Sequence, residues 1–489
     1  MEADDTSARL LPLASWQSTH KNSTEAKFSL RNVVLYVSLL VNLPALVIVF
    51  HPIQGFLWTP PRSEQPAAPQ WAEAVQAAER AASKWCSGNG NVFVDTVGID
   101  ADGSPSCECN DCFAGPDCSL PLPDCVADAI SGDPLLFEAY WRKNSDLGAV
   151  VIPAWYRMGY QTRDVTSMPY TEALVASIRE LHAMVGNAVT EGRYIAFGTG
   201  STQLINAVIH SLALQDPGRV TPVVSKAPYY NAYYTQTEYF KSPFYSFSGE
   251  PDRKVGQQGP AQIEVIASPN NPTTQIQEVP QNVSGHVVYD HAYYWPHLTP
   301  ITKAVDYDIM LFTLSKLTGH AGSRIGWVIL KDFDLYTKVL RYADVSTIGL
   351  GHEAQLRASQ LIRTIIDGYS EGNSGREGIF HFAHDVLQSR WAKLQAIFQN
   401  VSRFSLQELK PGYCSFFKRV SDPSPGYAWI RCNREEDADC SAVLLSAGII
   451  GRAGPIFGTT PRYVRLSLLK RASHFDNLAD HLLKLVAQS

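Results

Sequence analysis

One lysine near the middle of the chain has neighbours that could make it chemically reactive. Residues 311–314 are apolar and strand-like, and the turn after them presents Ser315 and Lys316. Arg324 follows eight residues after the lysine, before a second apolar run. A lysine amine can bond covalently to the aldehyde of a phosphorylated cofactor, while an arginine binds the phosphate. Residues 311–326 therefore predict such a site, although a lysine at a strand end is more often a solvated loop residue.

Several other apolar runs of the chain also end in polar residues. Runs rich in β-branched and aromatic residues occupy 194–197, 220–224, 263–267, 286–289, 309–314 and 326–330. Helical patterns such as 173–185 lie between them. This alternation predicts an α/β domain with a mostly parallel sheet. Because ligands of such sheets bind at the carboxyl ends of the strands, the residues that follow each run are the candidate site.

The first of these strand ends predicts a phosphate site. Residues 198–203 read Gly-Thr-Gly-Ser-Thr-Gln and lead into a helical pattern. Glycines let the backbone approach a phosphate, and the N-terminus of a helix donates N–H groups to it. Glycine-serine turns also cap helices that bind nothing. The candidate residues are Gly200, Ser201, Thr202 and Gln203.

Later strand ends offer groups for a flat, charged ring. Tyr230 presents an aromatic face, and the amide of Asn271, in an Asn-Pro turn, could reach a ring hydroxyl. Asp290 ends an apolar run, where an unpaired carboxylate is costly to bury, so a protonated pyridine nitrogen is a fitting partner. Tyr293 could then reach the ring oxygen, and Arg465 could bind a substrate carboxylate in a bidentate fork. Each residue also has an interpretation without a ligand. The tyrosines could simply pack, Asn271 could lie in an ordinary Asn-Pro turn, and Arg465 could be an exposed arginine of a strand.

A metal centre is the competing interpretation of this region. His291 and His297 lie beside Asp290, but no cluster with ligand spacing accompanies them. The charge balance also limits the choice of partner. The 489 residues are 45% hydrophobic and 18% charged, with a net charge of -6. No basic excess of the kind that nucleic-acid binding needs is present, so nucleic acid is excluded as a partner.

The N-terminal part predicts a membrane anchor. Residues 32–50 contain no charged side chain over nineteen positions, a length that just spans a bilayer core. The run begins too far from Met1 for a cleaved signal peptide, and no Ala-x-Ala site follows it. Basic residues precede the run more than they follow it. We therefore expect a cytosolic tail at 1–31, a transmembrane signal anchor at 32–52 and a lumenal or extracellular remainder.

A linker and helix at 53–84 lead into a cysteine-rich module at 85–126. Six of the nine cysteines lie in this module, which contains no histidine. Disulfides are therefore favoured over zinc, and the sequence does not choose among their possible pairings. In the expected topology Asn282 and Asn400 are candidate glycan acceptors, whereas Asn22 faces the cytosol and stays unmodified.

The order of these parts resembles the fold-type-I enzymes that use pyridoxal phosphate, over residues 128–489. Residues 315–327 and 198–203 are similar to the plant alliinase and tryptophan aminotransferase-related family, and the cysteine module resembles the epidermal-growth-factor-like (EGF-like) domain that precedes alliinase. The resemblance implies a mostly parallel seven-stranded sheet and a smaller C-terminal α+β subdomain within 127–489. The segment from Cys432 to Cys440 resembles an alliinase disulfide loop, which leaves Cys414 unpaired.

The resemblance also implies a role for each candidate residue. Lys316 would hold the cofactor covalently and remove a proton from the substrate, while Arg465 would bind the substrate carboxylate. Tyr160 would reach the phosphate of a neighbouring subunit, which implies a homodimer. The remaining residues would bind the cofactor: its phosphate through Arg324, Gly200, Ser201, Thr202, Gln203, Thr313 and Ser315, and its ring through Tyr230, Asn271, Asp290 and Tyr293.

Two reactions use the same lysine. An aminotransferase would move the amino group of an L-amino acid such as tryptophan to a 2-oxo acid, which the resemblance links to auxin biosynthesis. A carbon-sulfur lyase would instead cleave S-alkyl-L-cysteine sulfoxides by β-elimination. The expected anchor resembles the anchored tryptophan aminotransferase-related proteins, so the aminotransferase is favoured. A catalytically silent binding protein on the same fold is the third possibility, and the intact set of Lys316, Asp290 and Arg324 argues against it.

Overall fold

The computed structural model describes residues 85–92, 107–160, 171–216, 218–251, 261–278, 285–370 and 377–488, together with Glu73, Gln76 and Arg80. The predicted tail and anchor lie outside the described residues, as do nearly all of the linker and helix at 53–84 and the candidate acceptors Asn22 and Asn282. No helix among the described residues is long and apolar enough to cross a membrane.

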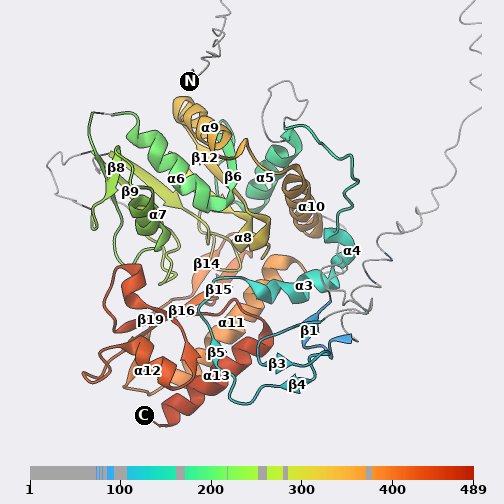
Figure 1. Cartoon of the computed structure of the whole chain (residues 1–489), viewed down its shortest axis with the longest axis vertical. Helices are drawn as coiled ribbons and strands as arrows, with labels where there is room; N and C mark the ends of the chain where they lie inside the picture. Colours follow the sequence, from blue (N-terminus) through green and yellow to red (C-terminus); the bar gives the residue numbers. More distant parts are fainter. Residues whose placement is uncertain are drawn as a thin grey trace, which may run out of the picture. The chain divides into compact units, whose positions relative to one another are not determined.

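A seven-stranded sheet forms the centre of the larger part of residues 127–489 (Figure 1). Its strands pair in parallel except β12, which runs antiparallel to both of its neighbours. In spatial order they are β6 (Tyr194–Thr199), β12 (Ile325–Leu330), β11 (Ile309–Thr313), β10 (Gly285–Asp290), β9 (Gln262–Ala267), β7 (Thr221–Val224) and β8 (Tyr245–Phe247). The mostly parallel sheet predicted from the sequence is therefore confirmed, and the three-residue edge strand β8 is an addition.

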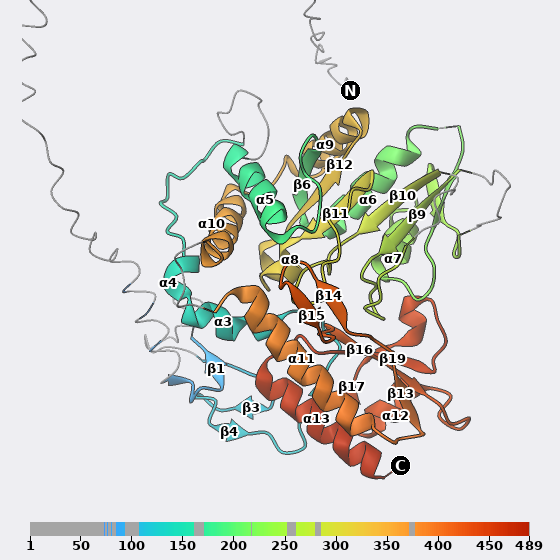
Figure 2. The same ribbon diagram turned by 180° about the vertical axis from the view of Figure 1, so that it is seen from behind.

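Helices cover both faces of this sheet (Figures 1 and 2). The helices α5 (Glu172–Val185) and α10 (His352–Gly368) share one apolar cluster with Phe312 and Trp327. On the other face, α6 (Gly200–Ala213), α7 (Ala232–Phe240) and α9 (Phe333–Thr347) pack against Leu311 and Val328. Because successive side chains of a strand point to opposite faces, two such clusters bury β11 and β12 on both sides and explain their continuous apolar sequences.

The helices begin where the sequence provides capping side chains. The Thr171 hydroxyl accepts a hydrogen bond from the backbone N–H of Leu174 at 3.3 Å, at the start of α5. The Asp332 carboxylate accepts one from Leu335 at 2.6 Å, at the start of α9. Each cap satisfies a backbone donor that the first turn of a helix otherwise leaves free.

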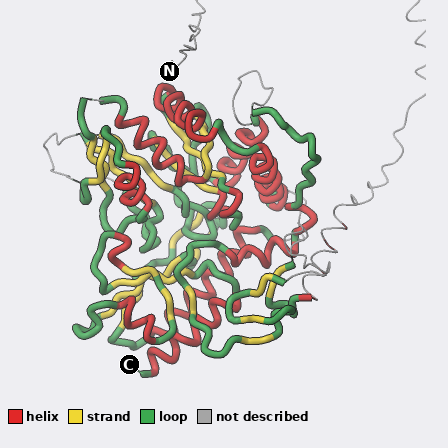
Figure 3. Tube along the Cα trace, viewed as in Figure 1, coloured by secondary structure: helices red, strands yellow, loops and turns green. Residues whose placement is uncertain are grey.

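A smaller sheet lies in the C-terminal part of the chain, in the lower half of Figure 3. Its four strands, in spatial order, are β13 (Phe404–Leu406), β16 (Tyr427–Cys432), β19 (Tyr463–Ser467) and β18 (Arg452–Ala453). The helices of this part are α11 (Ile379–Phe398), α12 (Cys440–Ser446) and α13 (Ala472–Ala487). The strand β5 (Ala127–Asp128) pairs with β17 (Ile449–Ile450), so the residues that follow the cysteine module join this smaller part.

The disulfides of the cysteine module follow one of the pairings that the sequence left open. Cys86 joins Cys107, Cys109 joins Cys118, and Cys112 joins Cys125. Two short hairpins, β1 (Gly90–Asn91) with β2 (Glu108–Cys109) and β3 (Phe113–Ala114) with β4 (Leu120–Pro121), lie within this framework. With so little secondary structure, such a module depends on its cross-links for stability.

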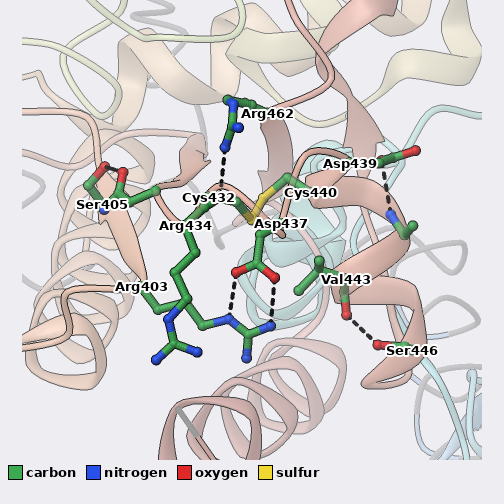
Figure 4. Close-up of a disulfide and its surroundings, with 12 residues drawn as sticks. Arg403, Ser405, Cys432, Arg434, Asp437, Asp439, Cys440, Val443, Ser446 and Arg462 are labelled. Carbon is green, nitrogen blue, oxygen red and sulfur yellow. Dashed lines mark hydrogen bonds and ion pairs between the residues drawn. A yellow bond between two sulfur atoms is a disulfide. The ribbon is translucent and has the colours of Figure 1, made fainter.

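A fourth disulfide joins Cys432 to Cys440, as the resemblance implied, and Cys414 is free and buried. Figure 4 shows the loop that this disulfide closes, in which both carboxylate oxygens of Asp437 face the guanidinium of Arg403. Arg403 donates from Nε at 2.7 Å and from Nη2 at 2.9 Å. This bidentate pair lowers the pKa of the Asp437 carboxyl, chiefly through the hydrogen bond from Arg403.

Candidate active site

One cavity of about 360 Å³ gathers most of the predicted residues. It opens where the carboxyl ends of the large sheet meet strands of the smaller sheet, which is where ligands of parallel sheets bind. The predicted residues that line it are Ser201, Thr202, Tyr230, Asn271, Asp290, Tyr293, Thr313, Ser315, Lys316, Arg324 and Arg465. Residues from the carboxyl ends of five strands thus come together with Arg324, which precedes β12, and Arg465, which lies within the later strand Tyr463–Ser467, although the first and last of these residues are more than 260 positions apart.

Lys316 lies in α8 (Leu314–Leu317), the single helical turn that follows β11. The Thr313 hydroxyl caps this turn by accepting a hydrogen bond from the Ser315 N–H at 3.2 Å. The ammonium group of Lys316 donates to the carbonyl of Gly132. A side chain at Gly132 would begin 2.6 Å from the Tyr427 hydroxyl and 3.5 Å from Lys316 Nζ. A larger residue at this position would therefore collide with Tyr427 beside the amine.

The N-terminus of α6 meets Arg324 at one end of the cavity. Gly200 begins this helix with φ +73°, and a Cβ there would collide with the guanidinium of Arg324. Arg324 is exposed and donates from Nη1 to the Ala321 carbonyl at 2.9 Å. Among the described residues no carboxylate forms an ion pair with it. Free helical N–H groups, hydroxyls and an unpaired arginine together suit a phosphate.

Asp290 ends β10 and is buried, with 4% of its surface exposed. Burial raises the pKa of its carboxyl, and two donors partly offset that effect. The Tyr233 hydroxyl donates to Oδ2 at 2.9 Å, and the Ala292 N–H donates to Oδ1 at 3.1 Å. Burial also raises the pKa of Tyr233 well above its usual value, so this hydroxyl keeps its proton and remains a donor.

A chain of polar side chains runs from the large sheet to the small one. Asn271 donates from Nδ2 to the Tyr293 hydroxyl at 3.1 Å, and this hydroxyl lies 2.9 Å from that of Tyr427. Burial raises the pKa of Tyr293. Burial alone would also raise the pKa of Tyr427, but the neighbouring charges of Lys316 and Arg465 outweigh it and lower the value. Of the two phenols, Tyr427 is the one that more readily gives up its proton.

Arg465 provides a buried cation at the far wall of the cavity. It donates from Nη1 to Asn271 Oδ1 at 2.9 Å and from Nη2 to the Ile130 carbonyl at 2.8 Å. Its guanidinium carbon lies 4.1 Å from the centre of the Tyr427 ring. Only 1% of Arg465 is exposed, its Nε has no hydrogen-bond partner, and no carboxylate among the described residues pairs with it. A buried charge without a counter-ion is costly, so the site fits an anionic ligand.

Three predicted residues lie outside this lining: Gly200, which begins α6 beside Arg324, Gln203 and Tyr160. The Gln203 carboxamide turns back to the Thr199 N–H at 2.7 Å and toward Ser346 of α9 at 2.9 Å, so its side chain does not face the cavity. Tyr160 is 76% exposed and lies beside residues 347–353. In a single chain it does not contribute to the cavity, and its assignment to a neighbouring subunit stays a prediction.

The two histidines that raised the metal alternative have local partners instead. His291 Nδ1 lies 2.6 Å from the Ser268 carbonyl, and His297 Nε2 lies 3.1 Å from the Lys316 carbonyl. Burial lowers the pKa of His291 to about 4 and that of His297 to about 3, so both rings are neutral at pH 7. No group of three or more potential metal ligands occurs in the part of the chain that the structure describes.

Sequence reasoning missed several residues that line or contact the cavity, among them four that bear on its chemistry. Gly132, Tyr233, Tyr427 and Arg452 each contact or line the site. Tyr233 follows Tyr230 by three positions, close to the start of α7, and this closeness in the sequence could have pointed to it. The other three lie on connections and on strands of the smaller part. The rule that ligands bind at the carboxyl ends of parallel strands does not apply there.

The sheet topology and the cavity define a class of protein. An aminotransferase from Staphylococcus aureus matches with a TM-score of 0.52 and 16% identity, covering 75% of this chain and 95% of that one. A substrate-bound BacF structure from Bacillus subtilis matches with a TM-score of 0.54 and 15% identity, covering 74% and 90%. Identities this low establish the fold alone. The chain therefore has the fold-type-I architecture of the aminotransferases.

The amino-acid sequence assigns the chain to a particular family within this class. The family model described as "Allinase" matches residues 127–486, and the "Alliinase EGF-like domain" matches residues 70–125. The chain belongs to the alliinase family, and it is a pyridoxal-phosphate-dependent enzyme of the aminotransferase and alliinase superfamily.

Curated relatives carry two kinds of name. Tryptophan aminotransferase-related protein 4 of Arabidopsis thaliana is 40% identical over 93% of this chain and 96% of that protein. Alliin lyase of Allium cepa is 41% identical over 84% of this chain and 86% of that protein. The family of the chain is therefore clear, while its relatives' names divide between transfer and cleavage.

The cofactor of this class fits the residues of the cavity. Arg324 and the N-terminus of α6 provide groups for a phosphate, Asp290 provides a buried acceptor, and Lys316 provides an amine. The EGF-like domain and its disulfides indicate an oxidising setting, in the secretory pathway or outside the cell.

Proposed function

We propose that this protein is an aminotransferase that moves the amino group of an L-amino acid such as tryptophan to a 2-oxo acid. The observation that carries the proposal is the arrangement of Lys316, Asp290 and Arg465 around one cavity. An amine, a buried carboxylate and an unpaired guanidinium are the three groups that an amino-acid reaction with pyridoxal phosphate requires.

In this proposal the cofactor is held at both of its ends. Arg324, the N-terminus of α6 and the hydroxyls of Ser201, Thr202, Thr313 and Ser315 bind the phosphate. Asp290 accepts a hydrogen bond from the ring nitrogen, and Tyr233 holds the carboxylate in place through its bond of 2.9 Å. Asn271 and Tyr293 face the ring oxygen, and Tyr230 lies against the ring. These roles are the ones that the family resemblance implies, and what supports them is that the side chains line or contact one cavity.

When bound, pyridoxal phosphate supplies an electron sink that makes the α-proton of the substrate acidic. Lys316 then removes this proton at Nζ and returns it to the product. Arg465 binds the α-carboxylate and so directs the Cα–H bond toward the lysine. Tyr427, whose pKa lies below its usual value, is placed to exchange a proton with Tyr293 at 2.9 Å.

The choice of transfer over cleavage depends on the predicted membrane anchor at 32–52, which resembles the anchored tryptophan aminotransferase-related proteins. The extent of similarity does not separate the two reactions: relatives named tryptophan aminotransferase-related match over 369 to 463 residues and the alliin lyases over 419 to 421, at about the same identity. The carbon-sulfur lyase remains the second candidate, because Lys316 and Arg465 serve either reaction.

The proposal is tested on the purified protein loaded with pyridoxal phosphate. The wild type should absorb in the visible range, and Lys316→Ala should lose that absorbance because the covalent bond to the amine is gone. Tryptophan and a 2-oxo acid together should yield indole-3-pyruvate. Release of pyruvate from an S-alkylcysteine sulfoxide without indole-3-pyruvate would assign the lyase activity instead. A colourless wild type would overturn the cofactor assignment.

We further propose a membrane-anchored homodimer with a lumenal or extracellular catalytic region. Tyr160 is exposed, as a residue that serves a partner subunit would be before assembly. Asn400 is also exposed and is accessible to glycosylation. Glycan mapping tests the topology, because modification at Asn22 but not at Asn400 or Asn282 would reverse the proposed orientation.

A further inference from the structure

A second cavity, of about 400 Å³, lies between the cysteine module and the rest of the chain. The module contributes Gly88, Gly90, Asn91 and Asn110 to its lining, and the other residues come from in or beside α3 (Glu138–Lys143), α11 and α13. In both ribbon views β1 lies beside α3 (Figures 1 and 2). The cavity shares no lining residue with the active-site cavity. It is therefore a separate space that the module and the larger domain form jointly.

Part of the lining of this second cavity is apolar. Leu135 and Leu136 contribute to it just before α3, and Ala139 follows on the helix itself. Phe382 and Val386 line it from α11, where a spacing of four positions places them on one side of the helix. Both are half-buried. A ligand with an apolar body would remove this surface from water.

Arg390 places a cation beside the apolar lining. It follows Val386 by four positions on the same side of α11, lines the cavity and is only 6% exposed. Nη1 donates to the carbonyls of Leu468 at 2.5 Å and Lys470 at 2.7 Å. Its Nε and Nη2 donate to no described residue. Burial lowers the pKa of Arg390 to about 10, so the guanidinium is still charged at pH 7.

The other charged groups of the lining have partners of their own. Arg471 donates from Nε and Nη2 to the two carboxylate oxygens of Glu138, each at 2.6 Å. Arg142 donates to the side-chain oxygen of Asn91 in the module. The one lining carboxylate among the described residues is thus used by Arg471. Arg390 is left without a counter-ion in the cavity.

The neighbours of Arg390 outside the lining do not replace a counter-ion. Its guanidinium carbon lies 4.9 Å from the centre of the Phe475 ring, which is a favourable contact but carries no net charge. The negative charge of Asp476 acts on Arg390 from a distance, while its carboxylate is exposed and pairs with Lys393 at 3.3 Å. A buried charge is costly unless an opposite charge pairs with it. The cavity therefore suits an anion.

We propose that this cavity is a second ligand site, which binds a small organic monocarboxylate with an apolar body. The carboxylate accepts hydrogen bonds from the guanidinium of Arg390, and the apolar body lies against Phe382 and Val386. Because these three residues follow one another along one side of α11, a single molecule meets both kinds of contact. A neutral molecule leaves Arg390 unpaired, and a small ion such as acetate leaves the apolar lining uncovered, so each binds less tightly.

The test is direct binding to the pyridoxal-phosphate-loaded protein, measured by calorimetry. The probes are 3-phenylpropionate, its neutral analogue 3-phenylpropanamide, and acetate. The wild type should bind 3-phenylpropionate at least about tenfold more tightly than either of the others, because the amide lacks the charge and acetate lacks the ring. Binding of the same probe at Arg465 of the active site is recognised because it persists in the variants described next.

Two variants remove the proposed site in different ways. Arg390→Gln removes the charge and should weaken binding of 3-phenylpropionate by about ten- to a hundredfold, the range of one lost charge-assisted contact. Ala139→Leu keeps every charge but fills the cavity from α3, where Ala139 is exposed and leucine suits a helix, so it should weaken binding as strongly. This second variant decides the question if Arg390→Gln does not fold.

Ala392→Leu is the matched control for the added side chain. Ala392 is exposed on α11 and does not line the cavity, so this variant should bind 3-phenylpropionate as the wild type does. Equal affinity of the wild type for 3-phenylpropionate and its amide would overturn the inference. Wild-type affinity in folded Arg390→Gln or in Ala139→Leu would also overturn it. None of these results depends on amino transfer, so the inference and the proposed function fail separately.

Discussion

Replacing Tyr233 by phenylalanine tests whether this tyrosine keeps Asp290 ready for the cofactor. The variant removes one hydroxyl and keeps the ring, whose edge-on contact with Tyr230 has a centroid distance of 5.6 Å. Asp290 then keeps only the Ala292 N–H as a donor, at 3.1 Å. Because the Tyr233 hydrogen bond lowers the pKa of Asp290, its loss raises that pKa and makes the ionised carboxylate harder to form.

The size of the effect follows from a single buried hydrogen bond to a charged group. Such a bond contributes about 1.5–3 kcal/mol, which is an upper limit for the loss in cofactor binding. We therefore expect the dissociation constant of pyridoxal phosphate to rise by roughly ten- to 150-fold at neutral pH. A protonated Asp290 cannot pair with a ring cation. As the pH is lowered, the affinity for pyridoxal phosphate should therefore begin to decline at a higher pH in the variant than in wild type.

In the assay, the cofactor-free protein is titrated with pyridoxal phosphate, and binding is measured by visible absorbance. The titration is repeated between about pH 5 and 9, a range that includes the pH at which proteins are usually most stable. Tyr234→Phe is the control, because Tyr234 is the next residue of α7 and is 45% exposed. It loses the same hydroxyl without touching Asp290. Equal affinities for Tyr233→Phe and Tyr234→Phe across this range would refute the reasoning.

Two further predictions concern stability and the phosphate end. Gly200→Ala should destabilise the fold by about 1–2 kcal/mol, the cost of a left-handed alanine, and should weaken cofactor binding by displacing Arg324. Denaturant unfolding and cofactor titration measure both effects, and Gly322→Ala, whose Cβ meets nothing within 4 Å, should change neither. Asp437→Asn should cost about 1–3 kcal/mol at pH 7 by removing the ion pair with Arg403. Since that pair lowers the pKa of Asp437, its stabilisation is lost as pH falls through the folded-state value, and unfolding curves of wild type and variant should converge in acid.

Much of the fold and of the site could be predicted because a parallel sheet has simple rules. The carboxyl ends of its strands meet at one edge, so Thr202, Asp290 and Lys316 had to lie together once their strands were recognised. The seven-stranded sheet and the Cys432–Cys440 disulfide agree with what the sequence implied. The short strand β8 was missed because three residues are too few to show a period.

The contacts between distant segments needed the structure. Tyr233 reaches Asp290 across 57 residues, and Tyr427 reaches Tyr293 across 134. The pairing of the six cysteines in the module also needed it, since every pairing fits the same spacing. These relations depend on how helices and loops pack, which no local pattern specifies.

The sequence by itself determined which reactive groups this protein has and at which strand ends they stand. Side-chain types and the positions of apolar runs along the chain can be read locally, and together they indicated Lys316 and Asp290. Only the tertiary structure decided which groups face one another and which charges remain unpaired. Arg452 shows the difference, because in the sequence it is one of many strand arginines. It is recognised as a residue of the active-site cavity only when the register of β18 and β19 places it beside Arg465.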